Sequence, residues 1–228
     1  SWEVNVLATQ KLVENAIKNK VKQFIFASSG SVYGIKKEKE VTEKLTLVPI
    51  STYNKTKMIS ERVLMSYEND IKIHCIRPAT VCGFSPRMRL DVTVNMFVFQ
   101  ALKFKSMSVF GGNQIRPNIH IQDLINVYKH FIFNPNLPNG FYNAGFENLK
   151  VIEIAKKVAK IIPSKINIKK IVDVRSYRQN SKKLLETGFK KQFSVIDAIK
   201  ELKEKYESKI FTETEKCYTV NWMKKLKL

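Results

Sequence analysis

The stretch VKQFIFASSGSVYG, residues 21–34, joins a short apolar run to a cluster of serines and glycines. Residues 21–27 have the length and the β-branched and aromatic content of a buried strand. Ser29 then stands where this strand ends. Ligands of open α/β sheets bind at the edge formed by the carboxyl ends of the strands. The stretch therefore predicts a central strand with a functional site beginning at Ser29.

The segments around this strand predict an α/β fold. Residues 2–19 place apolar side chains on one helical face, and Ser51 is a suitable N-cap for a second helix that carries Tyr53 and Lys57. Residues 71–76 repeat the buried-strand pattern. Because neighbouring parallel strands need long crossover connections, the order helix, strand, helix, strand predicts a parallel sheet.

The chain changes character after Gly83. A loop rich in proline and arginine precedes an expected helix at 92–104 and a short strand ending at Gly111. We expect a strand at 118–121, a helix at 123–133, a turn at 135–140, and further helices at 151–162 and 194–206. The last third therefore predicts a smaller mixed α/β lobe.

Composition narrows the class of protein. The chain has 228 residues, of which 44% are hydrophobic, enough for a substantial core. Its formal net charge of +20 comes mostly from scattered lysines, which indicates a solvated basic surface; attraction of an anionic substrate and nucleic-acid binding remain alternatives. No nucleic-acid-binding motif supports the last of these. We expect no nucleic-acid partner.

The cysteines, the histidines and the apolar runs indicate a soluble protein of a reducing compartment. The three cysteines have no metal-ligand or CxxC spacing, and an odd number does not indicate a disulfide framework. With only three histidines, we expect no metal site. No apolar run approaches the roughly 20 residues that span a bilayer, and no signal-peptide pattern begins the chain. We expect a cytoplasmic protein without a membrane partner.

Tyr53 and Lys57 carry the first chemical signal. Four residues apart on a helix, they share one face, and an ammonium held near a phenol favours the ionised form of the phenol. This pattern alone is weak because tyrosine and lysine are common on helix surfaces. Ser29 at the strand edge strengthens it, and the three side chains predict an acid/base site.

Several ordered motifs resemble the extended short-chain dehydrogenases, specifically the NAD-dependent epimerase/dehydratase family of nucleotide-sugar enzymes. They are Asn5-Val6 with Thr9, the segment 28–34, the segment Tyr53-Asn54-Lys55-Thr56-Lys57, and residues 77–83, 116–123, 141–145 and 185–189. The resemblance extends over nearly the whole chain. It is far more specific than any one of these motifs.

The resemblance implies a Rossmann-like, doubly wound parallel sheet with a smaller mixed α/β substrate-binding lobe. The sheet would comprise residues 1–82 and 119–145, and the lobe residues 83–118 and 146–228. Members of the family begin with a strand and a glycine-rich turn that receives the cofactor pyrophosphate. This sequence has only eight glycines and no such turn. We therefore expect that the first strands, about 75 to 85 residues, are missing, and that this piece alone binds NAD poorly.

The resemblance also implies roles for individual residues. Tyr53 would take a proton from a sugar hydroxyl or return it, and Lys57 would hold the nicotinamide ribose and lower the pKa of the phenol. Ser29 would hydrogen-bond the reacting oxygen. Asn5, Ser28 and Pro78 would join Tyr53 and Lys57 in the cofactor site, with NAD as the expected cofactor and NADP not excluded.

The expected substrate is a nucleotide-diphosphate sugar. The resemblance implies that Asn95, Arg116 and Arg175 grip its diphosphate and that Thr80 faces the sugar. Arg178 is an alternative to Arg175, and Arg87 and Arg89 are equally well explained as loop charges. We expect His120 to pack at a strand, Asp123 to cap a helix, and Cys82 to be a small buried residue.

The residues beside Ser29 bear on the reaction. The family's 4,6-dehydratases carry an Asp-Glu pair where this chain has Gly30 and Ser31, so dehydration is disfavoured. Transient oxidation of a sugar hydroxyl, with hydride return to the other face, needs only Ser29, Tyr53 and Lys57. We therefore expect an NAD-dependent nucleotide-sugar epimerase acting at C4, with a keto-sugar reductase as the enzymatic alternative.

Two further expectations concern class and assembly. A non-catalytic, dinucleotide-dependent binding or regulatory module is the alternative from another class, and retention of Ser29, Tyr53 and Lys57 together argues against it. The resemblance implies a homodimer formed through the helices at 2–19 and 51–69.

Overall fold

The computed structural model describes residues 1–170 and 176–226, which form two compact units. The first unit contains Ser1–Ala79, Leu124–Phe146 and residues 176–191. The second contains Thr80–Asp123, residues 147–170 and residues 192–226. The stretch 176–191 packs with the first unit, where Lys183 Nζ donates to Phe141 O at 2.8 Å and Ser181 Oγ accepts from Gly145 N at 2.9 Å; the sequence placed this stretch in the lobe. We describe each unit by itself.

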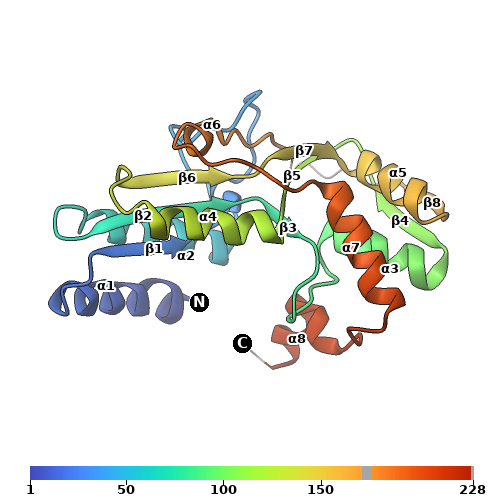
Figure 1. Cartoon of the computed structure of the whole chain (residues 1–228), viewed down its shortest axis with the longest axis horizontal. Helices are drawn as coiled ribbons and strands as arrows, with labels where there is room; N and C mark the ends of the chain where they lie inside the picture. Colours follow the sequence, from blue (N-terminus) through green and yellow to red (C-terminus); the bar gives the residue numbers. More distant parts are fainter. Residues whose placement is uncertain (171–175, 227–228) are drawn as a thin grey trace. The chain divides into compact units, whose positions relative to one another are not determined.

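The first unit is built on a parallel sheet of strand order β1-β2-β6, which confirms the predicted fold class. Its strands are β1 (Gln23–Ala27), β2 (Lys72–Pro78) and β6 (Gly140–Ala144). The register pairs Ala27 with Ile76 and Pro78 with Ala144. The carboxyl ends of all three strands therefore lie at one edge of the sheet (Figure 1).

Helices cover both faces of this sheet. η1 (Glu3–Leu7), α1 (Ala8–Lys18) and α2 (Thr52–Met65) lie on one face, where Val13 and Leu64 pack against Ile73. Strand side chains alternate between faces, and His74 packs on the other face against Phe131 of α4 (Ile121–Phe133), with ring centroids 4.8 Å apart. The sheet is therefore wound on both sides (Figure 1).

Only part of the apolar helix face predicted for residues 2–19 is buried within the chain. Val6 and Val13 are buried, as the pattern predicts, but Leu7 and Leu12 on the same expected face are 53% and 61% exposed. The start of the segment is a π-helix, whose wider turn changes which side chains follow one another along a face.

A short 3-10 helix, η2 (Gly30–Tyr33), follows β1 and turns the chain sharply at Gly34. Gly34 has φ of 71°, and a Cβ at this position would lie 1.9 Å from the carbonyl oxygen of Val48. Only glycine fits such a backbone conformation and close approach. The turn brings the following loop back onto the sheet edge, where Val41 is buried and bridges to Gln179.

A buried ion pair joins the sheet to α2. Arg77 of β2 donates from Nε and Nη2 to the two carboxylate oxygens of Glu61, at 2.8 and 2.7 Å, and the side chains are only 2% and 1% exposed. Ser28 Oγ donates to Glu61 Oε1 at 2.5 Å, and Arg77 Nη1 donates to the Tyr33 hydroxyl at 2.8 Å. The pair therefore fixes β2, α2 and the end of β1 to one another.

The pKa values of this cluster follow from its burial. Burial alone lowers the pKa of Arg77, but the hydrogen bonds and charge of Glu61 outweigh it and the net shift is upward. Burial also raises the pKa of Tyr33 to about 12. Both groups therefore keep their protons at neutral pH. The cluster is an ion pair of Arg77 and Glu61 surrounded by uncharged hydroxyl groups.

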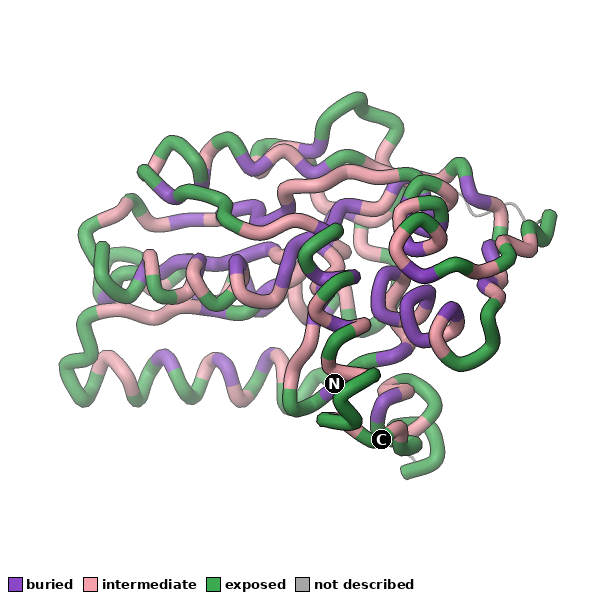
Figure 2. The backbone as a smooth tube through the Cα atoms, turned by 45° about the vertical axis from the view of Figure 1, so that its right-hand side comes forward, coloured by how far each residue is buried: buried purple, intermediate pink, exposed green. Residues whose placement is uncertain are grey.

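The second unit has a sheet of order β3-β5-β7 and a parallel pair β4-β8. Its elements are β3 (Thr80–Cys82), α3 (Thr93–Phe104), β4 (Ser106–Phe110), β5 (Ile115–His120), β7 (Glu147–Lys150), α5 (Val151–Ile161), β8 (Lys165–Lys169), α7 (Val195–Glu207), η3 (Glu215–Cys217) and α8 (Thr219–Lys225). Phe97, Ile154 and Leu202 contribute to a continuous core between α3, α5 and α7. Figure 2 shows the buried stretches of these helices in purple.

The observed bounds match most predictions within a few residues. Ser51 caps α2, since its Oγ accepts from the backbone N–H of Asn54 at 3.2 Å, and Ser194 caps α7 in the same way. β5 begins at Ile115, three residues before the strand expected at 118–121, because its first residues pair with β7. α6 (Lys182–Leu185) is a short helix that the sequence did not predict.

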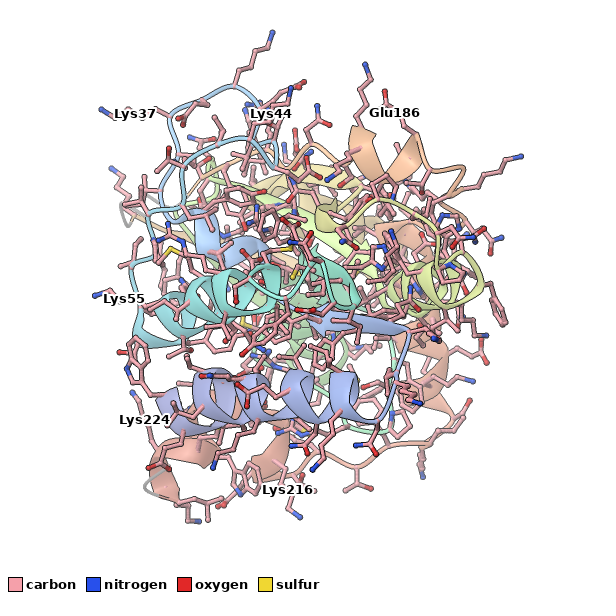
Figure 3. The ribbon with its side chains drawn as sticks, turned by 90° about the vertical axis from the view of Figure 1, so that its left-hand side faces the viewer. Lys37, Lys44, Lys55, Glu186, Lys216 and Lys224 are labelled. Atoms are coloured by element: carbon pink, nitrogen blue, oxygen red, sulfur yellow. The ribbon has the colours of Figure 1, made fainter. Side chains whose placement is uncertain are left out.

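Basic side chains project from the surface. Figure 3 shows Lys37, Lys44 and Lys55 pointing away from the ribbon. Within the described ranges, no helix is long and apolar enough to cross a membrane, and no group of three or more metal-ligating side chains is placed to hold an ion.

Glu61→Ala should lower the free energy of unfolding by about 3–5 kcal/mol, because it leaves the Arg77 guanidinium buried without its partner. Urea denaturation followed by circular dichroism measures the change. Glu68→Ala is the matched control, since Glu68 is exposed near the end of the same helical region and should change stability by less than about 0.5 kcal/mol. A loss below about 1 kcal/mol for Glu61→Ala would show that the pair is not structurally required.

Candidate active site

Ser29, Tyr53 and Lys57 lie at the carboxyl edge of the β1-β2-β6 sheet. Ser29 is the second residue after β1 and accepts a hydrogen bond from the backbone N–H of Ser31 at 3.2 Å, as the N-cap of η2. Tyr53 and Lys57 occupy the first two turns of α2. A strand end and a helix start thus bring the three predicted groups into one region.

Lys57 is the most constrained of the three. Its Nζ donates to the carbonyl oxygen of Ala27 at 2.9 Å and lies 4.7 Å from the ring centroid of Phe26 and 5.9 Å from that of Tyr53. Burial lowers the pKa of Lys57 from its ordinary value. The ammonium is therefore held between the strand end and the phenol ring.

Tyr53 is exposed beside Lys57. Its side chain is 47% exposed, although it stands on the same helix face as the half-buried Lys57. Its placement suits proton exchange with a bound molecule.

Ser29 is connected to α2 through two polar side chains. Ser29 Oγ and Ser31 Oγ are 2.7 Å apart, and Ser31 Oγ donates to Asn54 Oδ1 at 2.7 Å. Asn54 directly follows Tyr53 on α2. This contact and the bond of Lys57 to Ala27 are two independent ties between the strand end and the helix.

The residues expected around the cofactor differ in burial and in the hydrogen bonds that their side chains form within the protein. Ser28 is buried, and its hydroxyl is donated to Glu61. Asn5 donates from Nδ2 to Thr56 Oγ1 at 3.0 Å, which ties η1 to α2. Pro78, half-buried, ends β2. The side chains of Ser28 and Asn5 therefore contribute to the site by holding α2 in place.

Gly30 is closely surrounded. A Cβ at Gly30 would lie 3.1 Å from the carbonyl oxygen of Pro78 and 3.2 Å from Nε2 of Gln179. Gln179 is buried and donates to the carbonyl oxygen of Arg77 at 2.7 Å, so it has little freedom to move away. A side chain at position 30 would therefore require Pro78 or Gln179 to shift by a few tenths of an ångström.

Three of the residues expected to bind the substrate, Thr80, Asn95 and Arg116, lie in the second unit. Thr80 is half-buried in β3, and Arg116 is half-buried in β5. Asn95 is buried, and its amide bonds to the backbone: Oδ1 accepts from Gly83 N at 3.1 Å and Nδ2 donates to Arg89 O at 3.0 Å. Asn95 thus shapes the loop after β3. Arg175 lies outside the described residues.

The alternatives among the arginines have ordinary surface contacts. Arg87 donates to Thr219 Oγ1 at 3.0 Å and lies against the ring of Trp222, and Arg89 pairs with Asp91 at 2.9 Å. Arg178 is exposed.

Three other residues were given structural roles from the sequence. His120 stacks on Phe193 with ring centroids 4.9 Å apart, and Cys82 is buried, which raises the pKa of its thiol to about 12, so both predictions are confirmed. Asp123 does not cap the helix it was assigned to. Its carboxylate accepts from the backbone N–H groups of Gln192 and Phe193, both at 3.0 Å, because it is fully buried and those donors need an acceptor.

The profile described as "NAD dependent epimerase/dehydratase family" matches residues 1–145, more than half of the chain and all of the elements that carry Ser29, Tyr53 and Lys57. The chain belongs to this family. The fold of the NAD-dependent epimerase/dehydratase family is thereby established for it.

Individual family members are similar at lower levels of identity. The protein named "Uncharacterized UDP-glucose epimerase YtcB" of Bacillus subtilis (strain 168) is 32% identical over 161 residues, 69% of this chain and 50% of the relative. The dTDP-D-glucose 4,6-dehydratase of Homo sapiens is 25% identical over 162 residues, 70% of this chain and 46% of the relative. The chain thus spans about half the length of the curated relatives it matches.

A solved structure supports the same fold. The UDP-glucuronic acid 4-epimerase from Bacillus cereus, in complex with NAD, aligns with a TM-score of 0.78 at 27% identity, over 90% of this chain and 67% of that one. Both epimerases and dehydratases are therefore among the relatives, and the choice between them depends on the residues of the site.

Sequence reasoning missed the supports of this family site. Glu61, Arg77, Tyr33 and Gln179 received no role, yet they form the buried cluster beneath Ser28. One signal was available: Glu61 follows Lys57 by four residues on the same helix face, and Arg77 is a charge inside an apolar strand. A buried charge in a strand requires a partner of opposite sign.

The lowered pKa of Lys57 should appear as a pH-dependent stability. Below its folded pKa, Lys57 is charged in both the folded and the unfolded chain, and the burial penalty is fully present. As the pH rises toward the ordinary lysine value of 10.5, the folded chain loses this proton first, so the penalty disappears. The unfolding free energy of the wild type minus that of Lys57→Met, measured by urea denaturation, should therefore rise as the pH approaches this ordinary value.

Lys55→Met is the control for this measurement, because Lys55 is exposed on the same helix (Figure 3). Its difference from the wild type should stay flat over the same range. A flat difference for Lys57→Met as well would mean that the Lys57 ammonium is fully solvated.

Proposed function

We propose that this chain is the catalytic part of an NAD-dependent nucleotide-sugar epimerase. The observation that carries the proposal is the pair of ties between strand end and helix, Lys57 Nζ to Ala27 O at 2.9 Å and Ser31 Oγ to Asn54 Oδ1 at 2.7 Å. They hold a hydroxyl, a phenol and an ammonium at one ligand-binding edge. Membership of the family supports the reaction class.

The donor set suits the ribose and nicotinamide end of a dinucleotide. Lys57 has three N–H donors, of which the bond to Ala27 uses one, and the remaining two match the paired hydroxyls of a ribose. Asn5, Ser28 and Pro78 would lie next to this end of the dinucleotide. NAD, when bound, supplies hydride acceptance and return. The solved epimerase from Bacillus cereus is in complex with NAD, which supports this assignment.

The residues of the chain would perform the proton chemistry. Tyr53 takes the proton of a sugar hydroxyl as the carbon is oxidised and returns it when the carbon is reduced. Lys57 stabilises the phenolate by its charge. Ser29 hydrogen-bonds the reacting oxygen and keeps it near Tyr53. Thr80, Asn95, Arg116 and Arg175 remain our proposed substrate contacts, with Arg175 outside the described residues.

The surroundings of Ser29 favour epimerisation over dehydration. Elimination of water needs a second acid/base pair, and the positions that hold it in dehydratases are Gly30 and Ser31 here. A side chain at position 30 would be in tight contact with Pro78 and Gln179. A keto-sugar reductase uses the same three residues and is the second candidate. We place the oxidised hydroxyl at C4 and the protein in the cytoplasm.

Tyr53→Phe should lower kcat by about 10²- to 10⁴-fold, since it removes the group that moves the proton but keeps the ring. The assay incubates the protein, alone and with any residues that precede Ser1 in the natural protein, with NAD and UDP-, GDP-, CDP- and dTDP-sugars. Epimerised sugar is quantified by chromatography. Ser29→Ala should lower kcat by about 10²- to 10³-fold.

Tyr218→Phe is the matched control, because it removes a phenol hydroxyl from the second unit, where it bonds to Glu213. Its kcat should stay within about twofold of wild type. Unchanged turnover in Tyr53→Phe would refute the mechanism. Release of water, detected as a deoxy-keto sugar, would favour dehydration.

The homodimer implied by the resemblance is also part of our proposal. Val4, Leu7 and Leu12 of η1 and α1 are 72%, 53% and 61% exposed, an apolar group on helices that the family prediction assigns to the interface. Leu7→Asp with Leu12→Asp should convert a dimer to a monomer in sedimentation velocity. Leu185→Asp, at an exposed leucine elsewhere, should leave the mass unchanged. A monomeric wild type would contradict this assembly.

A further inference from the structure

The hydrogen-bond direction between Ser29 and Ser31 follows from the number of their protons. A serine hydroxyl has one hydrogen and two lone pairs. Ser31 Oγ donates its hydrogen to Asn54 Oδ1 at 2.7 Å. The 2.7 Å contact between Ser29 Oγ and Ser31 Oγ therefore requires Ser29 to be the donor. In this state the chain of donors runs from Ser29 through Ser31 to Asn54.

This direction suits one oxidation state of a substrate only. The Ser29 oxygen accepts from the backbone N–H of Ser31 at 3.2 Å, and its second lone pair is available to accept from an alcohol. A ketone has no hydrogen to donate, so Ser29 must donate to it. Ser29 can do so only if its own hydrogen leaves Ser31.

The Asn54 amide, at the end of this chain of donors, is able to rotate and so reverse the direction of its hydrogen bond to Ser31. In the described structure the Asn54 side chain bonds only to Ser31, and Asn54 is half-buried on the first turn of α2. An amide presents an acceptor on one side and donors on the other. Turning the Asn54 amide by half a turn breaks no second bond and places Nδ2, a donor, against Ser31.

We propose that Ser29, Ser31 and Asn54 form a reversible hydrogen-bonded chain that serves the alcohol and the ketone of the substrate in turn. With Asn54 Oδ1 toward Ser31, Ser29 accepts from the alcohol. With Asn54 Nδ2 toward Ser31, Ser31 donates to Ser29 and Ser29 donates to the ketone. Ser31 and Asn54 are positioning residues, since they act through Ser29. The inference rests on the proposed function, in which one carbon passes through both states.

Asn54→Asp provides the critical test. A carboxylate is nearly isosteric with the amide but only accepts, so it locks the chain in the alcohol direction. We expect kcat to fall about 10- to 100-fold from the loss of a donor to the developing ketone. The KM of the alcohol substrate should change less than about threefold, because Ser29 still accepts from it. Asn54→Leu, the less conservative change, should cost less, since Ser31 is then able to turn its hydrogen toward Ser29.

A double-mutant cycle with Ser31→Ala separates this mechanism from a structural role. Without the Ser31 hydroxyl, the residue at 54 no longer controls Ser29. Asn54→Asp should therefore change kcat by less than about twofold in the Ser31→Ala background. Ser31→Thr, which keeps the hydroxyl, should restore the full cost of Asn54→Asp.

Two controls address charge and folding. Lys55→Ala changes the net charge by the same amount one residue away, on an exposed side chain that points from the ribbon (Figure 3). Its kcat should stay within about twofold of wild type. The loss in Asn54→Asp should persist across the pH profile, whereas an effect of charge on Tyr53 would disappear at high pH. Thermal melting by circular dichroism should give similar Tm values for all variants.

The outcomes distinguish failure of the reversible chain from failure of the proposed function. An equal cost of Asn54→Asp in both backgrounds, or a larger cost for Asn54→Leu than for Asn54→Asp, would overturn the reversible chain while leaving the proposed function intact. A wild type that converts no nucleotide sugar with NAD would overturn both.

Discussion

The first unit depends on the buried pair of Arg77 and Glu61. Burying two charges is costly, and only bidentate geometry with further hydrogen bonds compensates for it. Both conditions are met, because Glu61 also accepts from Ser28 and Arg77 also donates to Tyr33. Since a displaced partner would leave a bare charge in the core, β2, α2 and the end of β1 have one permitted arrangement. The candidate site at their edge is therefore held in a fixed arrangement as well.

Catalytic geometry is a consequence of this constraint. Glu61 lies one helical turn after Lys57, and Ser28 immediately precedes Ser29. The bond between Ser28 and Glu61 therefore sets how far along the helix the strand end lies. The contacts of Lys57 with Ala27 and of Asn54 with Ser31 complete the alignment on the solvent side.

The sequence predicted the elements of the site well and their supports poorly. Ser51 as a cap, residues 21–27 as a strand, and Tyr53 with Lys57 on one face are local patterns that short windows reveal. The ion pair joins residues far apart in the chain, and nothing local states which buried charges meet. The exposure of Leu7 and Leu12 escaped prediction for a related reason, since periodicity shows an apolar face and not what covers it.

Gln179 has a consequence for how this site could change over time. It fills the space above Gly30, and it also lies against Gly145, where an added Cβ would be 2.6 Å from Gln179 Oε1. An added Cβ at position 30 would lie 3.1 Å from the Pro78 carbonyl oxygen and 3.2 Å from Gln179 Nε2, so an acidic residue there requires these neighbours to shift. Acquiring elimination chemistry would thus be coupled to a change at position 179, and that change would also remove the buried hydrogen bonds of Gln179 to Arg77 and Asn143.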